Sequence, residues 1–187
     1  VEKTTPLIVC EQIKKTFPFI PIFLLLNNSA ETDYFKRKLE SITYVDMLFT
    51  WNGDANIFFS MIKLLEDKIN AENDTQLGRV RIILLVEDSP TYYSRYLSFL
   101  YKVVMEQTKR IIDDVSTDEL YKVLRMRARP KILLATNFEE ATDIIKKYRD
   151  YITCLITDVK FERKGKFDED AGIKLLEYTQ KRLRNLP

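Results

Sequence analysis

Five short apolar runs alternate with amphipathic stretches, and this alternation constrains the fold more than any other feature of the chain. The runs are IPIFLLLN (20–27), VDMLFTW (45–51), VRIILLV (80–86), KILLATN (131–137) and YITCLIT (151–157). Strands that are apolar on both faces are typical of a sheet covered by helices on both sides. We therefore predict an α/β fold with a doubly wound, mainly parallel sheet of five strands.

The stretches between the runs carry helical periodicity. Helices are expected at about 7–17, 31–42, 56–70, 91–112, 116–128 and 138–148, and from about 169 onward. In the third of these, Phe58, Met61, Leu65 and Ile69 form one apolar stripe, which predicts its buried face. The polar, aperiodic segment AENDTQLG (71–78) indicates a linker.

Composition excludes several classes of site. Histidine is absent, which rules out His-based catalytic triads, His-ligated zinc and an internal phosphohistidine. The four glycines form neither a GxGxxG nor a GxxxxGK motif, so the glycine-loop nucleotide sites are missing. With 30 basic and 28 acidic residues, the net charge of +2 gives no electrostatic case for nucleic acid or an anionic membrane.

Cellular location follows from the apolar segments and the cysteines. The longest apolar run, FPFIPIFLLL (17–26), contains two prolines and is too short to cross a bilayer. Cys10 and Cys154 lie in apolar runs and no CxxC pair exists, which predicts two reduced, buried thiols. We expect a cytoplasmic protein.

Acidic residues follow two of the predicted strands at the point where each ends. Glu87 and Asp88 come directly after 80–86, and Asp158 follows 151–157. Ligands of open α/β sheets bind at the carboxyl ends of the strands, so we expect these side chains to converge there. Carboxylates that meet repel one another unless a cation lies between them, and Mg²⁺ prefers oxygen ligands. Taken alone, Asp158 is equally well explained as a solvated loop residue or a helix N-cap.

Three segments resemble response-regulator receiver domains. ILLVEDSP (83–90) is similar to their first strand, ATNFEEATDII (135–145) to their second strand and helix, and LITDV (155–159) to their third strand. The segment 113–130 is longer than its counterpart in a standard receiver.

The resemblance implies a role for each residue of the acidic group. Asp158 would be the phosphoryl acceptor and Asp88 a direct Mg²⁺ ligand. Glu87 would bind the metal through water, and the backbone carbonyl of Lys160 would complete the site. We expect a signalling module that accepts a phosphoryl group from a histidine kinase or phosphotransfer protein and regulates a linked output domain.

The chain divides into two parts under this resemblance. Residues 1–76 resemble the C-terminal half of a degenerate receiver, and residues 77–187 the N-terminal portion of a second receiver that carries the acidic site. The usual Ser/Thr position falls near Leu26-Asn27 and the usual Lys position near Thr50-Trp51, so both customary residues are missing. The alternative is therefore a pseudo-receiver interaction or dimerisation domain that performs no phosphotransfer.

The two halves together supply one complete set of receiver strands in permuted sequence. We predict that they assemble into one flavodoxin-like sheet of order 2-1-3-4-5, within one chain or as a domain-swapped homodimer. The whole chain also resembles the junction of tandem receiver-like domains ahead of phosphoenolpyruvate- or pyruvate-binding enzyme modules. Both ends are accordingly expected to be cuts through a longer protein.

Other interpretations have less support. Haloacid-dehalogenase-type phosphatases need a second aspartate at position 160, which is lysine, and EDSPTYY (87–93) lacks the loop that binds FMN, so no enzyme activity is expected of this chain. RMRARPK (125–131) could contact nucleic acid but is more typical of a solvated helix end.

Overall fold

The computed structural model describes residues 6–39, 43–113, 119 and 126–183. Its helices are α1 (Pro6–Thr16), α2 (Ser29–Leu39), α3 (Asn56–Gly78), α4 (Pro90–Asp113), α6 (Phe138–Lys147) and α7 (Ala171–Gln180). Its strands are β1 (Phe23–Leu26), β2 (Met47–Thr50), β3 (Ile82–Val86), β4 (Lys131–Ala135), β5 (Ile152–Thr157), β6 (Phe161–Arg163) and β7 (Lys166–Asp168). The predicted α/β class is confirmed.

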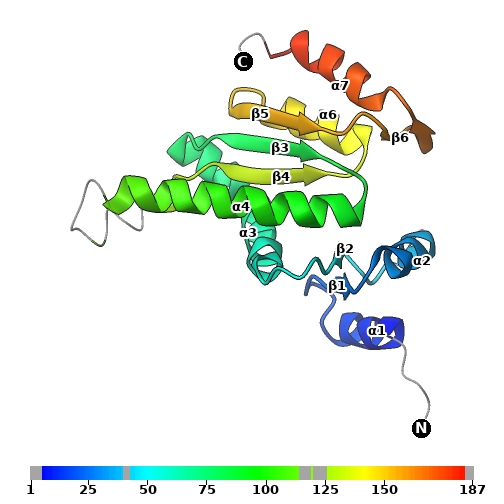
Figure 1. Cartoon of the computed structure of the whole chain (residues 1–187). Helices are drawn as coiled ribbons and strands as arrows, with labels where there is room; N and C mark the ends of the chain where they lie inside the picture. The colour runs from blue at the N-terminus through cyan, green and yellow to red at the C-terminus, as the bar shows by residue number, and fades with distance from the viewer. Residues whose placement is uncertain (1–5, 40–42, 114–118, 120–125, 184–187) are drawn as a thin grey trace.

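Three parallel strands in the order β4-β3-β5 form the principal sheet, which lies between two layers of helices (Figure 1). Alternate residues of the central strand β3 point to opposite faces, as the pleat requires. Ile82 and Leu84 pack with α6 and α7, where Ile145 and Leu175 are fully buried. Leu85 packs on the other face with α3 and α4. This burial on both faces explains why the strand is a continuous apolar run.

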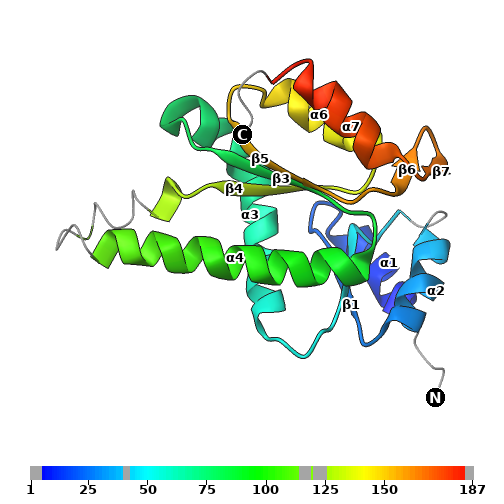
Figure 2. The ribbon, with the colours of Figure 1, turned by 45° about the horizontal axis from the view of Figure 1, so that its top comes forward.

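Strands β1 and β2 form a separate parallel sheet on the far side of α4 (Figures 1 and 2). The rings of Phe49 on β2 and Tyr93 on α4 meet edge to face, with their centroids 5.8 Å apart. The backbone N–H of Thr50 donates to Ser94 Oγ at 3.0 Å. In the described part of the chain, one five-stranded sheet is therefore not formed, because β1 pairs with β2 and not with β5, and β2 packs against α4.

The segment 71–78 is helical and is not the linker that its polarity indicates. It forms the last turns of α3, and Ala71, Asp74 and Thr75 within it are buried. Asp74 Oδ2 lies 2.8 Å from Lys131 Nζ at the start of β4, so the polar side chain is buried together with its counter-charge. The predicted boundary at 76/77 falls within this helix.

The buried face of α3 also differs from the predicted stripe. Phe58 is 50% exposed and Ile69 is 68% exposed. The positions that face the core are instead Ile57, Ser60, Leu64, Asp67, Ala71, Asp74 and Thr75. This face of the helix is buried because Asp67 pairs with Arg129 in the interior.

Two further differences concern local structure. Residues 160–170, where no strand is expected, contain the antiparallel hairpin β6-β7, whose turn is formed by Lys164 and Gly165 at positive φ. Most of the expected helix 116–128 lies outside the described residues. None of the helices that the structure describes is long and apolar enough to cross a membrane.

Candidate metal centre

Glu87, Asp88 and Asp158 meet at the carboxyl edge of the three-stranded sheet. Val86, the last residue of β3, is in register with Thr157, the last residue of β5, so the acids that follow are brought side by side. The backbone N–H of Asp158 donates to Val86 O at 2.9 Å and extends this pairing by one residue. One carboxylate oxygen from each acid lies within 4.8 Å of the others. The structure thus brings the predicted carboxylates together.

Glu87 is the buried member of the acidic cluster, with 4% of its surface exposed. Burial, together with the neighbouring charges of Asp158 and Asp88, raises the pKa of Glu87 to about 7. The backbone N–H of Ser89, which donates to Glu87 Oε1 at 3.1 Å, acts in the opposite direction. A carboxylate in this environment needs a cation or a proton at neutral pH.

Asp158 lies in a tightly packed loop between β5 and β6. Its Oδ1 accepts from the backbone N–H of Val159 at 2.7 Å. Its carbonyl oxygen is so close to Gly172 that a Cβ atom there would approach it to 2.1 Å. The N–H of Gly172 donates to Val159 O at 2.9 Å. The first turn of α7 therefore fixes the backbone that presents Asp158. The Lys160 side chain points toward Glu169, 3.9 Å away, and metal binding by the Lys160 carbonyl stays a prediction.

Lys36 of α2 contacts the cluster, and reasoning from the sequence did not identify it. Its Nζ donates to Asp88 Oδ2 at 2.9 Å and to the backbone oxygen of Asp88 at 3.1 Å. The two residues are 52 positions apart and lie on elements that the sequence places in different halves. A basic helix end was the only sequence signal, and it does not specify a partner.

The positions that correspond to the missing receiver residues lie at the ends of β1 and β2. Leu26 pairs in register with Thr50. Thr50 is buried, and its Oγ1 lies 2.9 Å from Thr32 Oγ1 and 3.4 Å from Thr91 Oγ1. The Trp51 ring packs against Phe58, with centroids 5.7 Å apart. These positions supply hydroxyl and apolar contacts, and no cation.

The acidic cluster fits a hard divalent cation. Three carboxylates offer only oxygen ligands, which Mg²⁺ prefers, and Asp88 and Asp158 are accessible to solvent. Among the described residues, no lysine or arginine is in hydrogen-bond contact with the buried Glu87 carboxylate, and Lys36 contacts Asp88 instead. Asp88 and Asp158 could bind the ion directly, and Glu87 from its buried side.

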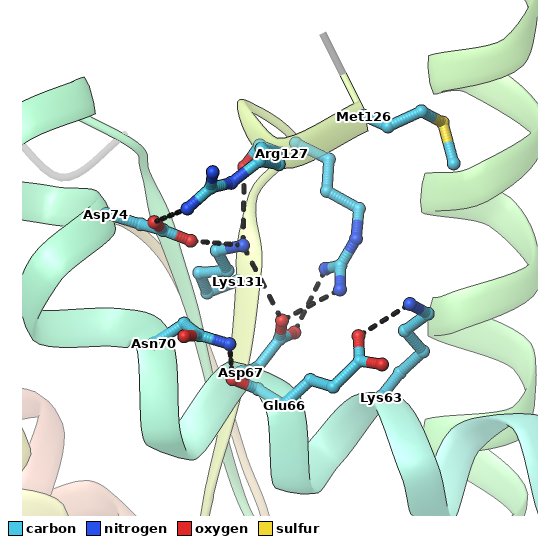
Figure 3. Close-up of a pocket in the computed structure, with 9 residues that line it drawn as sticks. Lys63, Glu66, Asp67, Asn70, Asp74, Met126, Arg127 and Lys131 are labelled. Carbon is cyan, nitrogen blue, oxygen red and sulfur yellow. Dashed lines mark hydrogen bonds and ion pairs between the residues drawn. The ribbon is translucent and has the colours of Figure 1, made fainter. Parts of the chain in front are cut away.

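A second cluster of charges surrounds Asp67 of α3, whose side chain is fully buried (Figure 3). Arg129 donates to both of its carboxylate oxygens, at 2.8 and 3.0 Å. The backbone N–H of Ile132 donates to Oδ2 at 2.9 Å, and Tyr101 Oη donates to the same oxygen at 3.0 Å. Lys131 Nζ lies 3.9 Å from Oδ1. These contacts hold α3 against β4, with Arg129 and Lys131 as the buried partners of Asp67.

This arrangement corrects the interpretation of RMRARPK (125–131) as a solvated helix end. Arg129 and Lys131 are each 5% exposed. Both form ion pairs with aspartates of α3. Two basic groups of the segment are thus withdrawn from solvent and from any nucleic acid, while Arg127 stays exposed at the rim of a 460 Å³ pocket.

Glu87 should make the stability of the metal-free protein depend on pH. Its pKa of about 7 in the folded state exceeds the ordinary value of 4.5, so the folded protein holds this proton more tightly than the unfolded chain. The stabilisation is present below pH 4.5 and is lost as the pH rises through 7, by about 3 kcal/mol.

Urea unfolding measures this effect when the wild type and Glu87→Gln are compared between pH 5 and pH 8 without divalent cations. Gln can still accept from Ser89 but does not titrate. We expect the free energy of unfolding of the wild type to fall relative to that of Glu87→Gln as the pH rises. A constant difference would show that Glu87 titrates normally.

Comparison of the chain with protein-family models, curated proteins and solved structures gives no match.

Proposed function

We propose that the chain is a receiver-type regulatory module that accepts a phosphoryl group on Asp158 in a Mg²⁺-dependent reaction. The supporting observation is the convergence of three carboxylates from the ends of two adjacent parallel strands. The strand order β4-β3-β5 agrees with the order 2-1-3 of the first three strands of a receiver.

The chemistry would use groups of this chain in distinct roles. A carboxylate oxygen of Asp158 attacks the phosphorus of the donor, a new P–O bond forms, and the bond between phosphorus and the donor's leaving oxygen or nitrogen breaks. Mg²⁺, held by Asp88, Asp158 and the Lys160 carbonyl, with Glu87 through water, would neutralise charge on the phosphoryl oxygens. Because the chain has no histidine, the donor would be a separate histidine kinase or phosphotransfer protein.

Incubation with MgCl₂ and acetyl phosphate, followed by intact-mass measurement, tests the proposal. We expect one phosphoryl adduct on the wild type, with acetate released, and none on Asp158→Asn. Asp143→Asn is the matched control, because Asp143 is an exposed aspartate on α6 that pairs with Lys146. An adduct on Asp158→Asn, or none on the wild type, would refute acceptance at this residue.

The alternative is a pseudo-receiver that serves in interaction or dimerisation. The absence of a serine or threonine near Leu26-Asn27 and of a lysine near Thr50-Trp51 favours it. In that case the strands of two copies would complete a five-stranded sheet of order 2-1-3-4-5 by domain swapping. The same samples, measured under native conditions, distinguish the two: a dimer mass without an adduct supports the alternative.

A cytoplasmic location, a linked output domain and tandem receivers ahead of a phosphoenolpyruvate- or pyruvate-binding module remain part of the main proposal.

A further inference from the structure

The ammonium group of Lys36 supplies the acidic cluster with a cation from the chain itself. It contacts Asp88 twice, through Oδ2 at 2.9 Å and through the backbone oxygen at 3.1 Å. The side chain of Lys36 is 48% exposed, whereas that of Asp88 is 22% exposed. The contact can therefore open into solvent without disrupting a core, and it fixes α2 to the junction of β3 and α4 while it is closed.

A second contact joins the same helix to the same junction. Thr32, one turn before Lys36 on α2, has its Oγ1 2.9 Å from Thr50 Oγ1, which in turn lies 3.4 Å from Thr91 Oγ1. Thr91 belongs to the first turn of α4, three residues after Asp88. The contact through Thr32 is uncharged, so only the contact through Lys36 responds to the charge at the acidic cluster.

Lys36 and a divalent cation would compete for Asp88. Mg²⁺ brings two positive charges to the carboxylates and repels an ammonium group bound to the same side chain. We infer that Lys36 is the resident counter-ion of the cluster, that Mg²⁺ displaces it, and that this displacement frees the end of α2 from the β3–α4 junction. This inference rests on the proposed function for the metal, and concerns how occupancy of that site is communicated to α2.

Titration of the protein with MgCl₂ alone, followed by calorimetry, tests the competition. Lys36→Met removes the charge but keeps an unbranched side chain, and we expect it to tighten Mg²⁺ binding about fivefold, as suits the loss of one partly exposed competitor. Lys36→Arg should bind Mg²⁺ like the wild type. Lys14→Met is the matched control, because it removes another lysine–aspartate pair, that of Lys14 with Asp46 at 2.8 Å.

Hydrogen exchange of the amides of α2 tests the release. Mg²⁺ should speed exchange of α2 in the wild type and in Lys14→Met, and should leave Lys36→Met unchanged because its contact is already lost. Equal Mg²⁺ affinities of the wild type and Lys36→Met, weaker binding by Lys36→Met, or exchange of α2 that ignores Mg²⁺ would each overturn the inference.

The outcome is separable from that of the phosphorylation experiment, because no phosphoryl donor is present. The displacement is supported if Lys36→Met binds Mg²⁺ more tightly than the wild type and Mg²⁺ speeds the exchange of α2 in the wild type but not in Lys36→Met. This holds even if Asp158 never accepts a phosphoryl group. A wild-type protein that accepts a phosphoryl group but has the same Mg²⁺ affinity as Lys36→Met refutes the displacement alone.

Discussion

Replacing Asp67 by alanine should lower the free energy of unfolding by about 3–5 kcal/mol, the usual cost of removing one member of a buried ion pair. The substitution leaves Arg129 and Lys131, both buried, without the carboxylate that they share. It also removes the acceptor of the Ile132 N–H and of the Tyr101 hydroxyl. The attachment of α3 to β4 would be lost, and urea denaturation followed by circular dichroism measures the effect.

Two comparisons separate the charge network from general effects. Tyr101→Phe removes one hydrogen bond to Asp67 and should cost about 1 kcal/mol. Asp143→Ala breaks an exposed pair with Lys146 and should cost less than about 0.5 kcal/mol. If Asp67→Ala were no more costly than Asp143→Ala, the buried network would not hold the two elements together.

Gly172→Ala should destabilise the protein by about 3 kcal/mol and also weaken Mg²⁺ binding at the acidic cluster. A Cβ atom at this position would lie 2.1 Å from Asp158 O and 3.0 Å from Val159 Cα, and backbone atoms cannot move aside as a flexible side chain can. The loop would have to shift, and Asp158 would shift with it. Thermal unfolding and calorimetric titration with MgCl₂ measure the two effects.

Gly78→Ala is the matched control for Gly172→Ala. Its new Cβ would approach only the Cγ2 atom of Val80, at 3.2 Å, at the end of α3 and remote in sequence from the cluster. We expect a change in stability below about 1 kcal/mol and unchanged Mg²⁺ affinity. A Gly172→Ala protein that matched the wild type in both measurements would mean that the contact between α7 and the Asp158 loop does not position the acid.

The strands and the acidic cluster could be predicted because both depend on local patterns. The apolar runs predict β3, β4 and β5, and register follows once the strands are parallel. Glu87, Asp88 and Asp158 therefore meet because each follows the end of its strand. The principles that predict this are the burial of parallel sheets and the common edge at which their strands end.

The failures involve pairings between distant residues. The helix α3 does carry an apolar stripe through Phe58 and Ile69, but both residues are exposed. A different face of the helix is buried because Asp67 pairs with Arg129, 62 positions away. Periodicity treats an aspartate as an exposed residue and contains no information about its partner. The pairing of Lys36 with Asp88 was missed for the same reason.

The hydrophobic pattern of the sequence also could not predict where the strands β1 and β2 pack. An apolar strand can extend a sheet or pack on a helix, and the hydrophobic pattern is the same for both. The choice of α4 as partner depends on the fit of Phe49 against Tyr93 and on the hydrogen bond of Thr50 to Ser94.

The length of α3 has a consequence for cooperativity. Ile57 near its beginning belongs to the cluster that contains Phe49 of β2 and Leu85 of β3, and Ala71 near its end belongs to the cluster on the opposite face of the larger sheet. One continuous helix thus contributes to the two cores that cover the larger sheet, one of which also contains Phe49 of β2. Neither sheet can melt without withdrawing the helix from the other, so the chain should lose its structure in a single transition and behave as one folding unit.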